Sequence, residues 1–156
     1  MSLFCLCVVE SIREKSEVAL CARQLELIAK QYNRGVKFFA DWSDPFVSDI
    51  QKQSFIMNIT DGPSFSNCEL FLLPDGWYYN GKTNKLPFRE RMEFLKSVVS
   101  FFAEKKCVVD LYLGVSGICA QEFTHFTVSV NELMDCLVKT VGTHGAEESV
   151  HISITP

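Results

Sequence analysis

The sequence predicts an α+β fold in which a mostly antiparallel sheet is covered by two long helices and one or two short ones. Two segments carry apolar residues at three- and four-residue steps, which is typical of amphipathic helices. The other apolar segments are short, and several follow one another without an intervening helix, which favours hairpins over a strictly alternating parallel fold. No repeat or Pro/Gly/Ser linker divides the 156 residues, so we expect one domain spanning 1–156.

The two long helices are expected at residues 12–34 and from Pro87 to about 106. Ser11 and Glu14 have the spacing of a capping box, and Gly35 follows as a left-handed stop. The second helix is apolar around more of its circumference, so we expect more than one layer to cover it. The inward stripes comprise Val18, Cys21, Ala22, Leu25, Ile28, Ala29 and Tyr32 in the first helix, and Phe88, Met92, Leu95, Val99 and Phe102, widened by Phe94, Val98 and Phe101, in the second.

Two shorter helices are expected from their start signals. Asp44 followed by Pro45 is an N-cap with proline at the first helical position, which predicts a helix near residues 45–53. Ser129 and Glu132 have capping-box spacing, which predicts a helix that continues to Gly142.

Short apolar runs predict the strands. The turn Pro74-Asp75-Gly76 predicts a hairpin in which 77–80 returns antiparallel to 68–73. The last segment alternates apolar Val150, Ile152 and Ile154 with polar residues, which marks a strand with one wet face. The expected strands are 3–9, 36–42, 54–60, 68–73, 77–80, 107–114, 122–128 (pairing near 107–114) and 150–155.

The seven cysteines are expected to be reduced thiols in a cytoplasmic protein. No basic residue precedes the apolar run at 3–9, so we predict neither a signal peptide nor the disulfides of a secreted protein, and no run is long enough to cross a membrane. Cys5 and Cys7 face the same side of a strand, the core side. They lack the two further ligands of a zinc site, so we expect no metal.

Charge is unevenly distributed along the chain. The stretch from Asp41 to Asn80 holds six acids and one base, a charge of −5, while the whole chain carries −4. Residues 82–106 hold seven bases and three acids. An acidic surface disfavours nucleic acid and favours a basic protein partner.

Catalytic signatures are weak. Phe123 and His125 fall on one face of an expected strand, and a Cys–His pair of His125 with Cys119 or Cys107 is geometrically conceivable. A partly buried histidine bonded to backbone is the commoner arrangement and is the one we expect. Gly114 to Gly117 lacks the lysine of a phosphate-binding loop and is expected to be a plain turn. We therefore predict no catalytic residue and no cofactor.

Aromatic residues accompany the acidic ones. In a strand, Trp77 and Tyr79 share one face and Tyr78 takes the other, so at least one large aromatic side chain lies near the surface. Ordinary cross-strand packing accounts for such residues, but amphipathic aromatics among acids also make a protein-binding hot spot. The predicted partner-binding residues are Asp41, Trp42, Asp44, Asp75, Trp77 and Tyr79.

The second half of the chain has a recognisable series of elements: the helix 88–106, VVDLYLG, EFTHFTVSVNELMDCLV with its Thr127-Val-Ser129 lead into a short helix, and VHISI. This series resembles the closing portion of small bacterial immunity proteins, which neutralise contact-dependent or other polymorphic toxins. The resemblance implies a cytoplasmic inhibitor without enzymatic activity that blocks a toxin. A toxin that acts on nucleic acid, and is therefore basic, suits the acidic segment.

Two other functional classes stay open. One is a small enzyme or ligand-binding domain with a pocket near His125 and Cys119. The other is an acidic secretion chaperone. We expect a protein partner rather than nucleic acid or membrane, and a toxin domain encoded beside this chain distinguishes an immunity protein from the other two classes.

Overall fold

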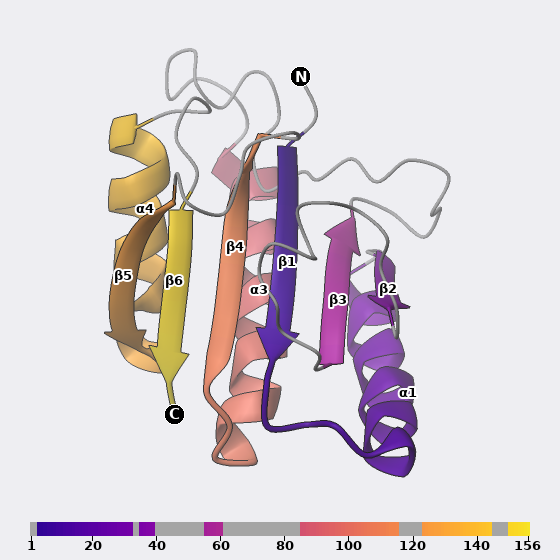
Figure 1. The fold of residues 1–156 in the computed structure, drawn as a ribbon. Coiled ribbons are helices and arrows are strands. Elements are labelled where there is room, and N and C mark those ends of the chain that lie inside the picture. The colour runs from indigo at the N-terminus through magenta and orange to yellow at the C-terminus, as the bar shows by residue number, and fades with distance from the viewer. Residues whose placement is uncertain (1–2, 33–34, 40–54, 61–84, 116–122, 145–149) are drawn as a thin grey trace.

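The structure is a computed structural model, and it describes residues 3–32, 35–39, 55–60, 85–115, 123–144 and 150–156. The described strands form a single six-stranded sheet in the order β2-β3-β1-β4-β6-β5, with helices packed against it (Figure 1). This arrangement confirms the α+β class. The strands are β1 (Leu3–Val9), β2 (Gly35–Phe39), β3 (Phe55–Thr60), β4 (Val109–Val115), β5 (Thr124–Ser129) and β6 (Val150–Thr155).

Strand β1 lies inside the sheet and pairs antiparallel with both β3 and β4. The pairs β2–β3 and β4–β6 are also antiparallel, whereas β5 and β6 run parallel. A parallel pair needs a long crossover, which here contains the short 3₁₀ helix η3 (Val130–Glu132) and the helix α4 (Leu133–His144). The sequence placed 122–128 near 107–114; in the structure β5 pairs with β6, and β6 separates it from β4.

The two long helices are α1 (Lys15–Gln31) and α3 (Lys85–Glu104), and together with α4 they lie on the same face of the sheet (Figure 1). The apolar stripes of these helices pack against the strand side chains that point toward them, which are every second residue along a strand. Leu25, Leu95 and Phe102 are fully buried, as predicted, while Ile28 is partly buried against the same core. Phe94 and Val98 are buried and Phe101 is half-buried, which agrees with an unusually wide stripe on α3.

The helix ends differ from the prediction. Helix α1 begins at Lys15 with Glu14 as its N-cap, and Ser129 is the N-cap of η3; neither N-cap residue makes a side-chain capping bond. The first capping box is wrong, because the chain turns through Ile12, whose N–H donates to the Val9 carbonyl at 3.2 Å, before it becomes helical. Ser129 is the N-cap residue as predicted, but the predicted capping bond is not made. Gly35 does not end α1 but begins β2, since Tyr32 already caps the helix.

Some predicted elements lie outside the described residues. These are the helix near 45–53 and the hairpin formed by 68–73 and 77–80. None of the helices in the described ranges is long and apolar enough to cross a membrane. Among the cysteines whose side chains are described, Cys7, Cys21, Cys107 and Cys136 are reduced thiols, as predicted for these four.

Candidate functional site: a carboxylate–histidine–histidine chain on the outer face of the sheet

The sheet face opposite the described helices, here called the outer face, carries a group of polar and aromatic side chains. In β4, Val109 and Leu111 point into the helix-side core, so the alternate residues Asp110 and Tyr112 belong to the outer face. The register aligns Tyr112 with His151 of β6, and His151 with His125 of β5. Three neighbouring strands thus bring together residues that are far apart in sequence.

Asp110, His151 and His125 form a continuous hydrogen-bonded chain. The Nε2 atom of His151 lies 2.8 Å from Oδ1 of Asp110. The Nδ1 atom of the same ring lies 2.7 Å from Nδ1 of His125. Both nitrogens of His151 are therefore engaged, one by the carboxylate and one by the second histidine.

The partners determine where the protons lie. An ionised carboxylate only accepts hydrogen bonds, so Nε2 of His151 carries the proton and donates to Asp110. When that ring is neutral, its Nδ1 is an acceptor, so Nδ1–H of His125 donates to it. The Nε2 atom of His125 then holds a lone pair on an exposed ring, and it can accept a proton or a hydrogen bond from a bound molecule.

Aromatic rings hold the buried end of this chain in place. The Tyr112 ring stacks on the His151 ring with 4.5 Å between centroids and an interplanar angle of 19°. Phe123 packs edge-on against Tyr112 with centroids 5.5 Å apart. The exposed fraction of the side chain is 8% for Asp110 and 15% for His151, whereas His125 is exposed. The hydrogen-bonded chain therefore runs from the buried carboxylate of Asp110, its anchor, to the exposed ring of His125.

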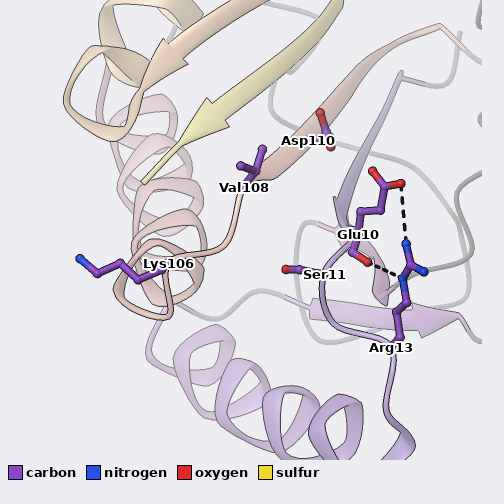
Figure 2. Close-up of a pocket in the computed structure, with 6 residues that line it drawn as sticks. All are labelled: Glu10, Ser11, Arg13, Lys106, Val108 and Asp110. Atoms are coloured by element: carbon purple, nitrogen blue, oxygen red, sulfur yellow. Dashed lines mark hydrogen bonds and ion pairs between the residues drawn. The ribbon is translucent and has the colours of Figure 1, made fainter.

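A hollow of about 510 Å³ lies beside the anchor. Figure 2 shows its six lining residues: Glu10, Ser11, Arg13, Lys106, Val108 and Asp110. Arg13 turns toward Glu10, donating from Nε to the Glu10 backbone carbonyl at 2.9 Å, and its guanidinium lies 3.9 Å from the Glu10 carboxylate (Figure 2). The hollow is widely open, and it meets the histidine chain at Asp110.

The described thiols lie on the other side of the sheet and do not join this chain. Burial, reinforced by the negative charge of Asp110, raises the pKa of the Cys7 thiol far above its usual value. Burial also raises the pKa of Cys21. Cys107 belongs to the helix-side core, where its Sγ donates to the Lys105 carbonyl at 3.7 Å. A catalytic pair of Cys107 with His125 is therefore excluded by the fold, and Cys119 lies outside the described residues.

The sequence directed attention to His125 but misjudged its surroundings. We expected a partly buried ring bonded to backbone; instead the ring is exposed and bonded to His151, because β5 pairs with β6 rather than β4. Asp110, Tyr112 and His151 were missed. The available signals were an aspartate inside the apolar run VVDLYLG and a histidine on the polar side of the last strand, since a buried carboxylate requires a partner.

The six predicted partner-binding residues, Asp41, Trp42, Asp44, Asp75, Trp77 and Tyr79, all lie outside the described residues. The described part of the chain contains no group of three or more His, Cys, Asp or Glu side chains able to hold a metal ion.

No family model, curated protein or solved structure matches this chain. An α+β fold alone does not specify an activity, so a function for this chain has to rest on the edge of the sheet and its histidine chain.

Proposed function

We propose that this chain works by binding another protein, as an immunity protein that neutralises a cognate bacterial toxin. The observation that carries the proposal is the exposed ring of His125 on β5, backed by a fixed polar and aromatic group. Strand β5 is at the end of the strand order and pairs only with β6 among the described strands. Such an edge is where a second chain can add backbone hydrogen bonds.

Preorganisation favours a protein-binding role for this edge. Asp110 and Tyr112 hold His151, and His125 is hydrogen-bonded to that ring, so less side-chain freedom is lost when a partner docks. Three of the six residues of β5 are exposed, namely Thr124, His125 and Thr127. The hollow nearby is open rather than enclosed, which suits a protein surface better than the concave sites that hold small molecules.

The charge distribution of the sequence supports a basic partner. A stretch of 40 residues carries −5 of charge and both tryptophans, and an acidic surface accelerates encounter with a basic protein. A toxin that acts on nucleic acid is itself basic, because its positive charges bind the phosphate backbone. We therefore include Asp41, Trp42, Asp44, Asp75, Trp77 and Tyr79 in the proposed binding surface, an assignment that rests on the sequence alone.

The first test is whether a toxin domain is encoded beside this chain, and the second is co-expression of this chain with that domain. We expect the toxin domain to arrest growth by itself, and this chain to relieve the arrest and to form a purified complex with it. Growth arrest that persists despite soluble co-expression, without a complex, contradicts the proposal.

Variants then locate the surface in that complex. We expect His125→Ala and Trp77→Ala to weaken binding about 30-fold or more, as for truncation of a hot-spot residue. Leu27→Ser is a matched control, because Leu27 is 61% exposed on α1, on the helix side of the sheet. If all three variants bind equally well, the binding surface lies elsewhere.

A second candidate, an acid–base enzyme, is favoured by the hydrogen-bonded chain itself. A carboxylate that orients an imidazole, with the final nitrogen left exposed, is the arrangement of a general base. Hydrolysis of p-nitrophenyl acetate probes this reactivity. Under this candidate His125→Gln lowers the rate well below that of His144→Gln, and equal rates for the two variants reject it.

A further inference from the structure

The two histidine rings direct two nitrogen atoms toward one another across neighbouring strands. His125 and His151 are directly opposite in the parallel register of β5 and β6, and their Nδ1 atoms are 2.7 Å apart. Only one proton lies between those atoms. Two imidazole nitrogens that converge on one point, with a carboxylate behind one of them, also make the beginning of a metal site.

The geometry points to a binding site for a divalent transition-metal ion, of the nickel, copper or zinc class, held by the Nδ1 atoms of His125 and His151. Neutral imidazole is the common protein ligand for these ions. Asp110 is the positioning residue, since it accepts the Nε2–H of His151 at 2.8 Å. This carboxylate–histidine pairing fixes the tautomer and raises the basicity of the ligand nitrogen.

The rings can accommodate an ion with a small movement. Two nitrogens that each lie about 2.1 Å from a tetrahedral ion are separated by about 3.4 Å. The Nδ1 atoms must therefore move apart by about 0.7 Å. His151 is held by Tyr112 and Asp110, so the adjustment falls on His125, whose ring is exposed and lies at 77° to that of His151.

Binding of the ion requires no proton donor or acceptor other than the two histidines and water. In the free protein His125 carries its proton on Nδ1; when the ion binds there, the proton leaves Nδ1 and another is taken from water at the exposed Nε2. Both imidazoles stay neutral, and no net proton is released from the neutral pair. The ion replaces one hydrogen bond with two coordinate bonds.

The remaining coordination positions belong to water, because the described residues supply no third ligand nearby. Two ligands are fewer than the four of a structural zinc site, so we expect weaker binding than at such a site. The metal site does not depend on the proposed inhibitor function, and its test requires no partner protein.

The test is titration of the full chain, without an affinity tag and with its cysteines kept reduced, with Ni²⁺ followed by calorimetry. Ni²⁺ is preferred as the probe because thiolates compete for Zn²⁺. We expect one saturable site, with selective paramagnetic broadening of the His125 and His151 ring signals in NMR spectra. Absence of a saturable site, or broadening centred on other residues, overturns the proposal.

Variants assign the ligands. We expect His125→Gln to abolish the saturable site and Asp110→Asn to weaken it about 10-fold or more. His144→Gln and Thr127→Gln are matched controls that leave it unchanged, the first removing the only other histidine and the second altering an exposed neighbour of His125 on β5. A His125→Gln variant that binds as tightly as the parent overturns the site, and a folded Asp110→Asn variant with unchanged affinity removes Asp110 from it.

Discussion

The two faces of the sheet are built from the same strands but differ in chemistry. On the helix side, Val109, Leu111 and Ile152 belong to a core of aliphatic, aromatic and cysteine side chains. On the outer face, Asp110, Tyr112 and His151 occupy the intervening positions. The helices α1, α3 and α4 cover the helix side, whereas the polar group on the outer face ends at the exposed ring of His125.

This difference shows how the same strands carry an apolar core on one face and a hydrogen-bonded polar group on the other. Side chains alternate in direction along a strand, so changing Asp110 need not disturb Leu111 beside it. The helix-side core stabilises the fold mainly through burial of apolar area. The outer face also buries the rings of Tyr112 and Phe123, but each of its hydrogen bonds adds little net stability because it replaces a bond to water.

The largest effect is expected in the helix-side core. Leu95 is fully buried on α3, and Leu95→Ala leaves a cavity as well as removing apolar contact, so the free energy of unfolding should fall by about 2–5 kcal/mol. Leu27→Ala is the control, because Leu27 is 61% exposed and its loss should change stability by no more than about 0.5 kcal/mol. Urea melts measure both. Equal losses in the two variants contradict the assignment of the core.

A smaller effect is expected at the buried end of the outer-face chain. Asp110→Ala removes the acceptor for Nε2–H of His151 in a partly buried position, so unfolding should become easier by about 1–3 kcal/mol. His125→Ala at the exposed end should cost about 1 kcal/mol or less, because water can replace its hydrogen bond. The same melts compare the two variants. A greater loss for His125→Ala would show that the exposed end, not Asp110, anchors the chain.

Thiol reactivity measures how deeply side chains are buried on the helix side of the sheet, where Cys7, Cys21 and Cys136 all lie. Burial raises the pKa of the thiols of Cys7 and Cys21, so less of each is thiolate at pH 8 than for a free cysteine of pKa about 8.5. We expect iodoacetamide to label both far more slowly than half-buried Cys136 in the native protein, as followed by peptide mass spectrometry.

A second measurement counts the reduced cysteines of the whole chain. Alkylation after denaturation without reductant should give seven labels; five or fewer would reveal a disulfide.

The smallest effect concerns the position of single protons. The hydrogen-bonded chain from Asp110 to the two histidines requires the Nε2–H tautomer for His151 and the Nδ1–H tautomer for His125. We expect ¹⁵N chemical shifts of the ring nitrogens, recorded at a pH where both rings are neutral, to show this opposite pair. The Asp110→Asn variant serves as a comparison, since it removes the charge behind His151. Two Nε2–H tautomers in the parent protein would show that the Nδ1 atoms share no proton.

The fold was predictable where the signal is local. Apolar residues at helical spacing located α1 and α3, and alternation located β6 with its buried Val150, Ile152 and Ile154. The helix starts were less predictable, because Ser11 has the spacing of a capping box yet Glu14 is the N-cap of α1, and Ser129 is an N-cap as predicted but makes no side-chain capping bond. The spacing permits such a bond, but the local path of the backbone decides whether it forms.

The sequence by itself determined the α+β class, the apolar faces of the helices and the segregation of charge, because each depends on residues that are close together in the chain. Only the tertiary structure decided that Asp110 meets His151, 41 residues away, and that His151 meets His125, 26 residues away. Those contacts depend on the strand order β4-β6-β5 and on its register. Strand order follows from how the whole core packs, so no short stretch of sequence could specify it.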